Sequence, residues 1–420
     1  MGKMTLSEEL NWRGFVNQTT LKNLKKLDEK KLIFYHGYDA SADSQTIGNL
    51  AAMMLDRLLM RHGYKAIIVA GGATSLIGDP GGKDAERQLQ DEKAVAHNIA
   101  KAEEQLKTVF KGFDFELVNN LSWFKEMTVI ELLRDYGKHF SMTPLVQRDY
   151  IAKRMGEGGA GISYAEFSYT VLQGIDYLHL FDKYGCTLQI GGSDQWGNCL
   201  SGIDLIRRLR GQEVEAMTQP LVINKSTGKK FGKSEEGAVW LDPKKTSPTQ
   251  FYQFWINVDD NSVEEYLKIY TELDKEEITK IIGEHNKDRS LRIAQEYLAI
   301  KVTELVHGKT DAQTAQAVTE VLVNPVGALK GINESIVQNV KKEIPFVITS
   351  SSASVLEALV NSGLASSNSE ARRLLSGGAI YINGQKTDRE NFQSSDFLDG
   401  RLLLRRGKAF KDSAFVELQK

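Results

Sequence analysis

The sequence is poor in cysteine and contains no long apolar run. Its 420 residues include two cysteines, Cys186 and Cys199, and no Cys-x-x-Cys pair. This excludes a disulfide framework and a cysteine-based structural zinc site, and it is typical of a reducing compartment. No apolar stretch reaches membrane-spanning length, and the first residues lack the apolar core of a secretory signal. We therefore expect a cytoplasmic protein without a membrane segment.

An excess of charge of either sign is also absent. The 53 Lys and Arg residues against 55 Asp and Glu residues give a net charge of -2. A nucleic-acid partner would therefore have to be bound by local basic patches rather than by the overall charge. The chain exceeds the size of a typical single domain and is 41% hydrophobic, so we expect two or three domains with cores of their own. No cluster of side chains at metal-ligand spacing stands out.

The segment 35–50, YHGYDASADSQTIGNL, lies between an apolar run at 32–35 and a helical pattern at 49–61. This is the order strand, turn, helix. A helix N-terminus offers unpaired backbone N–H groups and a positive dipole end to a phosphate. An ordinary tight turn with a helix cap would explain the glycines equally well. The apolar run KAIIVA at 65–70 follows the helix, which favours a doubly wound, Rossmann-like parallel sheet with ligands at the carboxyl ends of its strands.

Two further segments, far from residues 35–50 in the sequence, add to this pattern. They are GGSDQWGN at 191–198 and KFGKS at 230–234. Together with TIGN at 46–49, they resemble the HIGH and KMSKS signatures of class I aminoacyl-tRNA synthetases, in the form found in bacterial-type tyrosyl-tRNA synthetases. Further matching stretches extend this resemblance nearly from end to end, namely residues 12–14, 71–80, 167–176 and 245–257.

The resemblance implies a tyrosine–tRNA ligase. Tyrosine would be activated by ATP, supplied as its Mg²⁺ complex, to tyrosyl-adenylate and pyrophosphate, and then transferred to tRNA(Tyr). Such catalysis consists mainly of positioning and of stabilising charge on the leaving phosphates. The implied catalytic residues are Lys230, Lys233, Ser234, Thr46 and Ser41. The implied nucleotide contacts are Gly37, Asp39, Gly48, Asn49, Gly192, Asp194, Lys83, Arg87 and Lys233, and His36 replaces a residue that is often cysteine beside the ribose.

The same comparison implies a tyrosine pocket. Its residues are Tyr35, Asp79, Tyr169, Gln173, Asp176 and Gln195. Tyr169, Gln173 and Asp176 fall at helical spacing and share one face, which in isolation is also typical of an ordinary polar surface. Asp176 and Tyr35 would bond the substrate hydroxyl, and Tyr169, Gln173 and Asp79 would receive its ammonium group. We therefore expect Asp176→Ala to erode the selectivity for tyrosine over phenylalanine.

Thr46 departs from the family pattern, which has a histidine that donates to the phosphates of ATP. A threonine hydroxyl donates one hydrogen bond, reaches less far and carries no charge. A lost bond of about 1.5–3 kcal/mol slows the reaction about ten- to a hundredfold, so we expect a working enzyme that Thr46→His would speed. A synthetase-like paralogue that binds RNA or senses tyrosine is the alternative. A synthetase for tryptophan is disfavoured by Tyr35 with Asp176.

The pattern along the chain predicts several units. Residues 7–30 read as helical, with a cap at 17–20 for a second helix, and 91–110 as a further helix. The expected domains are a Rossmann-like catalytic domain at 1–235 with a helical connective insertion at about 121–165, an α-helical anticodon-arm domain at 236–342, a linker at 343–353, and a small α+β RNA-binding module of the αL type at 354–420.

Partners follow from the resemblance as well. The insertion implies a homodimer, with Trp123, Phe124, Phe140, Met142 and Leu145 as candidate interface residues that would otherwise fill the domain's own core. Clustered arginines and lysines can contact successive phosphates of tRNA, although any one of them is also explained as a solvated surface charge. The candidates are Arg207 and Arg208 for the acceptor arm, and Arg372, Arg373, Arg405, Arg406 and Lys408 in the C-terminal module.

Overall fold

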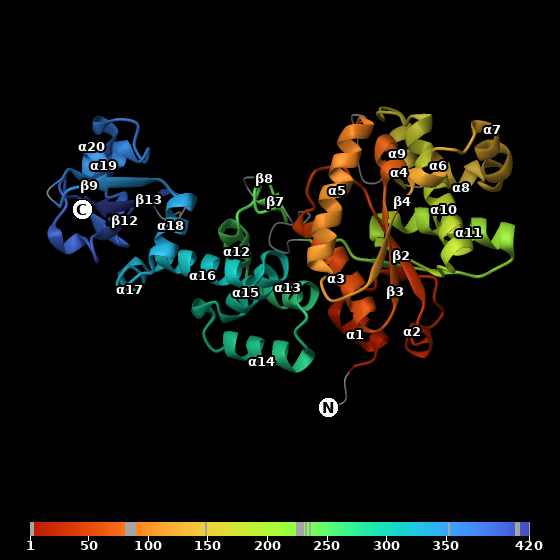
Figure 1. The fold of residues 1–420 in the computed structure, drawn as a ribbon, viewed down its shortest axis with the longest axis horizontal. Coiled ribbons are helices and arrows are strands. Elements are labelled where there is room, and N and C mark those ends of the chain that lie inside the picture. Colours follow the sequence, from red (N-terminus) through yellow and green to blue (C-terminus); the bar gives the residue numbers. More distant parts are fainter. Residues whose placement is uncertain are drawn as a thin grey trace. The chain divides into compact units, whose positions relative to one another are not determined.

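The computed structural model describes residues 4–79, 90–147, 149–223, 231, 233–234, 237–351, 353–407 and 412–419. The chain forms two compact units, which are Met1–Thr246 with Val258–Leu298 and Ser247–Asn257 with Ala299–Lys420. Figure 1 shows their helices and strands. Within the described ranges, no helix is long and apolar enough to cross a membrane.

The first unit is built around a six-stranded sheet. Its strands, in order across the sheet, are β1 (Gln18–Thr19), β6 (Glu215–Gln219), β5 (Leu188–Gly192), β2 (Ile33–Tyr38), β3 (Lys65–Ala70) and β4 (Phe115–Asn119). Only β1 runs antiparallel to its neighbour. The chain passes from β2 to β3 on one side and returns to β5 on the other, so the strand order reverses beside β2. Such a reversal opens a ligand crevice at the carboxyl ends of the strands, and the doubly wound α/β prediction is confirmed.

Helices cover both faces of this sheet (Figure 1). Tyr35 of β2 packs with residues of α10 (Tyr164–Tyr184) and α11 (Trp196–Arg210). Because side chains alternate along a strand, Tyr38 lies on the opposite face, with residues of α5 (Glu92–Val109). The helix α3 (Ile47–Arg61) contacts β3 and carries Asp56, which bonds to Tyr38 on that face. The side chains of β2 therefore alternate between a layer formed with α10 and α11 and a layer formed with α3 and α5.

The helices α3 and α10 have well-defined ends. Thr46 is the N-cap of α3 and forms a capping box with Asn49, whose Oδ1 accepts hydrogen bonds from the N–H of Thr46 at 3.0 Å and from its hydroxyl at 2.9 Å. Ser163 and Glu166 form a capping box at the start of α10. Gly185, with φ of 68°, ends α10 in the left-handed conformation that glycine adopts without strain. These caps fix where both helices begin relative to the strands.

The helical insertion after β4 consists of short elements. They are α6 (Leu121–Phe124), α7 (Val129–Glu131), the π-helix η1 (Leu132–Tyr136), the 3₁₀ helix η2 (Gly137–His139), α8 (Met142–Val146) and α9 (Asp149–Met155). Leu145 is buried with Ile151 and Phe167, so it fills this unit's own core, as the alternative explanation holds. Among the exposed apolar residues of the insertion are Val129 and Ile130, at 69% and 67%, and the interface candidate Met142, at 56%.

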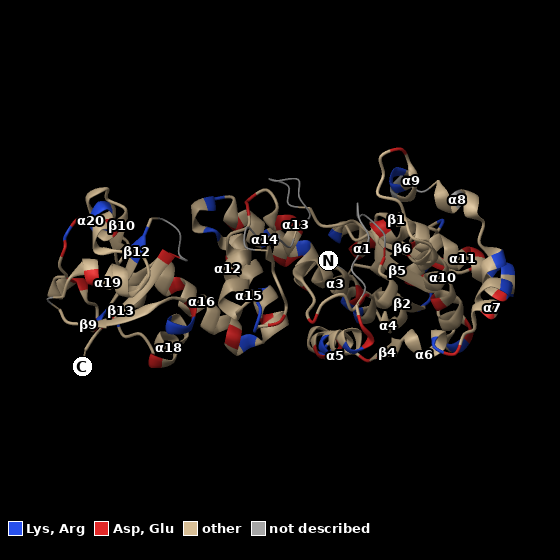
Figure 2. Cartoon of the chain, turned by 90° about the horizontal axis from the view of Figure 1, so that it is seen from above, with Lys and Arg blue, Asp and Glu red and all other residues tan. Residues whose placement is uncertain are grey.

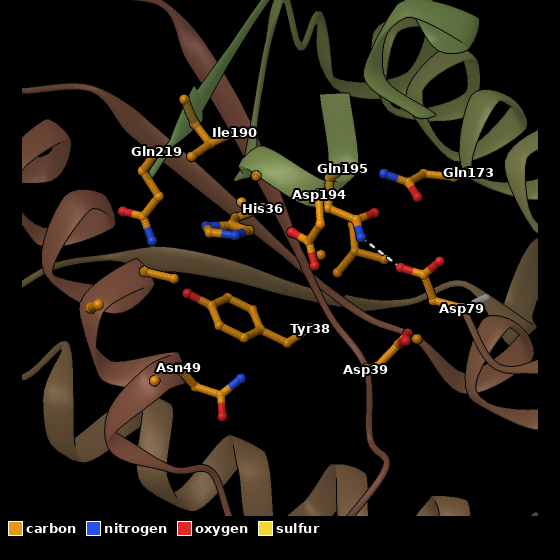
Figure 3. Close-up of a pocket in the computed structure, with 18 of the residues that line it drawn as sticks. His36, Tyr38, Asp39, Asn49, Asp79, Gln173, Ile190, Asp194, Gln195 and Gln219 are labelled. Atoms are coloured by element: carbon orange, nitrogen blue, oxygen red, sulfur yellow. Dashed lines mark hydrogen bonds between the residues drawn. The ribbon is translucent and has the colours of Figure 1, made fainter. Parts of the chain in front are cut away.

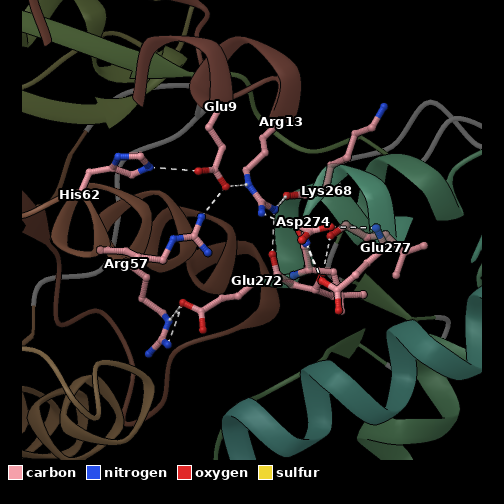
Figure 4. Close-up of polar contacts among 12 residues, drawn as sticks. Glu9, Arg13, Arg57, His62, Lys268, Glu272, Asp274 and Glu277 are labelled. Carbon is pink, nitrogen blue, oxygen red and sulfur yellow. Dashed lines mark hydrogen bonds and ion pairs between the residues drawn. The ribbon is translucent and has the colours of Figure 1, made fainter. Parts of the chain in front are cut away.

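A buried polar cluster joins three helices of the first unit (Figure 4). It consists of Glu9 and Arg13 from α1 (Leu6–Arg13), Arg61 from α3, and His62; we call it the Glu9 cluster. Glu9 accepts hydrogen bonds from Arg13 at 2.8 Å, from His62 at 3.0 Å and from Arg61. Arg13 also donates to three backbone carbonyls, at Lys268, Thr271 and Leu273, at 2.6–2.8 Å. These contacts fasten the turn between α13 (Val263–Tyr270) and α14 (Lys275–His285) to α1.

One sequence-based expectation for the first unit is wrong. The domain boundary expected after residue 235 stays a prediction, and residues 258–298 group with the first compact unit. The helix expected from residue 17 fails because Gln18 and Thr19 pair with β6, and only the short α2 (Lys26–Glu29) follows. The remaining elements of this unit are α4 (Gly72–Ile77), the 3₁₀ helices η3 (Ser193–Gln195) and η4 (Arg289–Leu291), and the strands β7 (Lys233–Ser234) and β8 (Gly237–Ala238).

The second unit combines helices with a five-stranded sheet. Its helices are α12 (Pro248–Ile256), α16 (Lys309–Val323), α17 (Pro325–Ala328), α18 (Glu334–Glu343), α19 (Val355–Asn361) and α20 (Asn368–Ser376), and α15 (Ile293–His307) contains the unit boundary. The strands, in order, are β11 (Gln385–Thr387), β10 (Ile380–Ile382), β12 (Arg401–Arg406), β13 (Ser413–Leu418) and β9 (Phe346–Thr349); the 3₁₀ helix η5 spans Ser394–Asp396. Basic and acidic residues are interspersed on α18, as on α5 (Figure 2).

The linker expected at 343–353 is wrong for four of its residues. Strand β9 pairs in parallel with β13, and Val347 is buried in the contact. Leu403 of β12 and Phe415 of β13 pack with residues of α16 and α18. One face of the C-terminal sheet therefore packs on α16 and α18, while the module has a second hydrophobic core of its own with α19 and α20.

Candidate active site

A cavity of about 320 Å³ opens at the carboxyl ends of the parallel strands (Figure 3). Asp39 follows β2, Gly71 follows β3 and Asn120 follows β4. Gly192 and Gln219 end β5 and β6. The cavity therefore lies where the reversal of strand order places it.

Most of the residues singled out from the sequence line this cavity. Those that do are Tyr35, Gly37, Asp39, Ser41, Thr46, Gly48, Asn49, Asp79, Tyr169, Gln173, Asp176, Gly192, Asp194 and Gln195. Lys83, Arg87, Lys230 and Lys408 lie outside the described residues. Lys233 and Ser234 form β7, of which the backbone alone is described, and its partner is β8. The structure thus gathers segments that are up to 160 residues apart in sequence.

One end of the cavity combines a carboxyl group with a phenol. Asp176 accepts hydrogen bonds from Trp123 Nε1 at 2.8 Å and from Asn120 Nδ2 at 3.1 Å. Burial raises the pKa of Asp176 to about 7, because these two neutral donors offset only part of the cost of burying its charge. Tyr35 is 2% exposed, and its hydroxyl has no partner among the described residues. Two buried polar groups here suit a ligand that carries a hydroxyl.

The neighbouring part of the cavity is rich in acceptors. Tyr169 donates to Asp39 Oδ1 at 3.2 Å, and Gln195 Nε2 donates to Asp79 Oδ2 at 2.5 Å (Figure 3). Gln173 Oε1 is buried without a partner in the described part of the chain. Two carboxyl groups and an amide oxygen suit a small cationic group such as an ammonium ion.

The third part of the cavity is the N-terminal end of α3. A Cβ atom on Gly48 would lie 3.5 Å from Thr46 Oγ1 and 3.9 Å from the backbone oxygen of Phe231. The ring of Phe231 packs on Tyr266 of α13, with ring centroids 4.3 Å apart. The hydroxyl hydrogen of Thr46 is used in the bond to Asn49. The donor that the sequence suggested for a phosphate is therefore already engaged in capping the helix.

Two family models of known proteins together match residues of both units. The family model described as tRNA synthetases class I (W and Y) matches residues 26–324. A second model, the tyrosine--tRNA ligase SYY-like C-terminal domain, matches residues 335–410. The chain belongs to the class I tRNA synthetases. The resemblance found in the sequence is confirmed.

Relatives of this synthetase cover nearly its whole length. It is 43% identical to the tyrosine--tRNA ligase of Staphylococcus haemolyticus, over 96% of this chain and 97% of that protein. It is 42% identical to tyrosine--tRNA ligase 2 of Bacillus cereus, over 99% of this chain and 100% of that protein. A C-terminally truncated mitochondrial tyrosyl-tRNA synthetase from Aspergillus nidulans has a TM-score of 0.69 at 31% identity, covering 76% of this chain and 94% of its own. A tryptophanyl-tRNA synthetase from Encephalitozoon cuniculi shares the fold alone, with a TM-score of 0.55 at 14% identity.

Some residues lining the synthetase cavity escaped sequence reasoning. Asn120 and Gln219 stand at the carboxyl ends of β4 and β6, so the rule that ligands bind at this edge would have identified them. Tyr38 ends β2 in the same way. Trp123, which the sequence suggested for a subunit interface, instead donates to Asp176 and stacks on His179 at 4.3 Å. Its role depends on the hydrogen bond to Asp176, which the spacing of residues in the sequence does not indicate.

The arginines suggested for tRNA binding lie on two surfaces of the synthetase. Arg207 and Arg208 are exposed in the last turn of α11, where Arg207 pairs with Asp204. In the second unit, Arg372 and Arg373 are exposed on α20. On β12, Arg405 lies 5.8 Å from the ring of Tyr381, and Arg406 donates to the carbonyl of Leu364 at 2.9 Å. The arginines on β12 are half-buried, which leaves those on α20 the more accessible ones.

Proposed function

We propose that the protein is a tyrosine–tRNA ligase, which activates L-tyrosine with ATP and transfers it to tRNA(Tyr). One observation carries the choice of tyrosine: Asp176, with a pKa of about 7, and the buried hydroxyl of Tyr35 line the same cavity. A substrate phenol gives both groups a partner. Phenylalanine would leave the buried hydroxyl of Tyr35 unpaired and would offer no further donor to Asp176, which is costly. The names of the full-length relatives support the same substrate.

In the activation step, Tyr169, Gln173 and Asp79 receive the ammonium group of tyrosine, and Gln195 orients Asp79 through their hydrogen bond. The tyrosine carboxylate attacks the α-phosphorus of ATP. A bond forms between carboxylate oxygen and phosphorus, the bond to the bridging oxygen breaks, and pyrophosphate leaves with that oxygen. Mg²⁺ enters with the nucleotide. The protein's contribution is to hold the reacting groups in line and to stabilise charge.

The nucleotide is held from several directions. Gly48 and Asn49 present the N-terminal end of α3 to the phosphates, an arrangement supported by the positive end of the helix dipole. Asp194 and Gly192, at the end of β5, lie by the ribose. Lys230, Lys233 and Ser234 stabilise the leaving pyrophosphate, and Lys83 and Arg87 add phosphate contacts, as the family signatures suggest.

For the transfer step, both units offer exposed arginines to tRNA(Tyr). We assign Arg207 and Arg208 to the acceptor arm, and Arg372 with Arg373 in the second unit to a more distant part of the tRNA. Phosphate contacts of this kind position the nucleic acid without reading bases. The exposed Val129 and Ile130 of the insertion support a homodimer through this segment. The reaction takes place in the cytoplasm, where tRNA is charged for translation.

The test is tyrosine-dependent exchange between ATP and pyrophosphate by the purified protein, run beside phenylalanine and tryptophan. We expect exchange with tyrosine alone. Exchange driven by tryptophan would overturn the assignment of the pocket. Tyrosine binding without any exchange, in this protein and in Thr46→His alike, would favour a paralogue that senses tyrosine or binds RNA.

A further inference from the structure

A second cavity, of about 530 Å³, lies between the helical insertion and α10. Trp123 of α6 lines this second cavity, and Asp176 of α10 lines the first. The hydrogen bond from Trp123 Nε1 to Asp176 Oδ1, at 2.8 Å, joins the walls of the two cavities. The indole of Trp123 therefore has a bonding partner at one edge and open space beside it.

The backbone around Trp123 does little to fix the indole in place. The helix α6 has four residues and no side-chain hydrogen bond at its N-cap, so it depends on its packing. The side chain of Trp123 is half-buried, and the ring of its neighbour Phe124 meets it at an angle of 47°, with ring centroids 6.3 Å apart. Because a cavity adjoins it, the indole could turn away from Asp176 unless another side chain held it.

His179 supplies this support. It follows Asp176 by three residues on α10, so the two side chains occupy neighbouring positions on one helix face. The imidazole ring stacks on the indole of Trp123, with ring centroids 4.3 Å apart and an angle of 15° between the planes. Stacked aromatic rings attract each other beyond the effect of burying their area. Asp176 and His179 therefore hold the same indole, one by its N–H group and the other by its face.

The stack is a contact between uncharged rings. Burial, followed by the charge of Lys183, lowers the pKa of His179, and Asp182 opposes this shift. The imidazole is therefore uncharged at neutral pH. Its Nε2 is buried and has no hydrogen-bond partner in the described part of the chain, so the face of the ring makes the contact with the indole. A phenyl ring would make the same contact.

We propose that His179 is a positioning residue for tyrosine recognition, because it holds the Trp123 indole where Nε1 keeps its hydrogen bond to Asp176. His179 does not line the first cavity and acts through Trp123. Without the stack, Asn120 would be the remaining donor to Asp176 among the described residues, and the carboxyl group could turn away from the substrate hydroxyl. The inference rests on the proposed function, because it takes tyrosine as the substrate.

The kinetic test measures kcat/KM for tyrosine and for phenylalanine in pyrophosphate exchange. His179→Ala should lower the ratio of the two values about two- to tenfold, the effect of one hydrogen bond, while the KM for ATP stays unchanged. His179→Phe retains the stack and should keep the ratio of the unaltered protein. Lys183→Ala is the matched control, because it shortens a side chain of the same helix in the same cavity, and it should also leave the ratio unchanged.

A double-variant cycle decides whether His179 acts through Trp123. Trp123→Phe removes the N–H group and should lower the ratio about as much as His179→Ala does. Because both residues serve one hydrogen bond, the double variant should lose no more than Trp123→Phe alone. Losses that add up in the double variant would overturn the inference, as would an unchanged ratio in folded His179→Ala. His179→Gln, which also lacks an aromatic ring, replaces His179→Ala if that variant fails to fold.

A spectroscopic measurement follows the same hydrogen bond without any activity. In ¹H–¹⁵N spectra of ¹⁵N-tryptophan-labelled protein, the Nε1–H signal of Trp123 is assigned through Trp123→Phe. It should move with a midpoint at about pH 7, as Asp176 loses its proton. In His179→Ala the signal should lie closer to that of a free indole and move less, and an identical titration would overturn the inference. Absence of exchange in the unaltered protein would instead refute the proposed function, while the spectra would still decide the role of His179.

Discussion

Glu9 and Asp176 are both carboxyl groups buried in the first unit, at 5% and 4% exposure, yet their pKa values shift in opposite directions. Burial alone would raise the pKa of Glu9, but hydrogen bonds from His62 and Arg13 and the charges of Arg13 and Arg61 outweigh it, so the pKa is lowered. Asp176 has only the neutral donors Asn120 and Trp123, and burial raises its pKa to about 7. Cationic donors outweigh the cost of burial at Glu9, whereas the neutral donors at Asp176 do not.

The difference separates a structural site from a binding site. Cationic donors surround Glu9, and its partner Arg13 also binds three backbone carbonyls, so the Glu9 cluster is closed to ligands. Asp176 keeps a carboxyl group that gains or loses its proton near neutral pH at the wall of a cavity, as groups at functional sites do. The helix α3 links the two regions, since it begins at the cavity with Thr46 as its cap and ends at Arg61 in the Glu9 cluster.

The largest effect is expected on stability when the Glu9 cluster is disrupted. Arg13→Ala leaves Glu9 with fewer cationic partners and leaves three carbonyls without their donor, so the free energy of unfolding should fall by up to about 5 kcal/mol. Urea unfolding at pH 7 measures it. Arg134→Ala is the matched control, because Arg134 is 69% exposed and its ion pair with Asp135 should be worth about 0–1 kcal/mol. Equal losses in the two variants would contradict the structural role of Arg13.

The next effect concerns the pH dependence of stability. The pKa of Asp176 is about 7 in the folded protein and 3.8 as its ordinary value, so the folded state binds the extra proton between these pH values. Stability contributed by this group is present below about pH 4 and is lost as the pH rises to about 7, by about 4 kcal/mol at most. Glu9 has the opposite sign: its lowered pKa gives stability that is lost only in acid.

Asp176→Asn should remove this loss. Urea unfolding of the variant and of the unaltered protein at pH 5 and pH 8 should show the variant gaining relative stability at the higher pH. Asp182→Asn, on the same helix and 37% exposed, provides the control and should give parallel values at the two pH values. Parallel behaviour of Asp176→Asn as well would mean that Asp176 ionises in the folded protein as an exposed carboxyl does.

The sequence was sufficient for the strands β2 and β3 because their signals are local, and for most of the cavity because its distant segments match family signatures. Residues 65–70 are an unbroken apolar run before a glycine turn, and the residues of 35–50 that line the cavity adjoin one another. Strand β1 was missed because its two residues are ordered only by β6, about 200 residues away. Strand β9 was read as a linker because a serine-rich stretch follows it and its order comes from β13. Contacts of this range leave no periodicity in the sequence.

Residue roles were harder to predict than residue positions. The sequence placed Asp176 in the pocket, but its neutral donors Asn120 and Trp123 come from another segment, and they decide its pKa. The sequence also gave no sign of the hydrogen bond from Arg13 to the carbonyl of Thr271, although residues 258–298 group with the first unit. Both facts depend on side chains that approach one another only in the folded chain.

A smaller effect, on substrate selectivity, is expected when Asp176 at the wall of the cavity is replaced. Asp176→Ala removes a hydrogen bond between the substrate hydroxyl and an ionisable group, worth about 1.5–3 kcal/mol. The ratio of kcat/KM for tyrosine over phenylalanine in pyrophosphate exchange should therefore fall about ten- to a hundredfold. Asp182→Ala should leave the ratio unchanged, since that residue pairs with Arg210 at the surface. A normal ratio in Asp176→Ala would remove Asp176 from tyrosine recognition.

The smallest effect is expected at the start of α3, where an uncharged pair holds the helix end that faces the cavity. Thr46→Ala removes the hydroxyl that donates to Asn49, and the loss of a cap costs about 1 kcal/mol of stability, measured by urea unfolding. Thr46→Ser keeps the hydroxyl and should stay within a few tenths of a kcal/mol of the unaltered protein. Thr46→His removes the same hydroxyl but brings a donor that reaches the phosphates, so its exchange rate should rise while its stability falls. Rate and stability could instead fall together in Thr46→His. The hydroxyl at this position would then serve the helix end rather than the phosphates, and the N-terminal end of α3 would have a structural role like that of the Glu9 cluster.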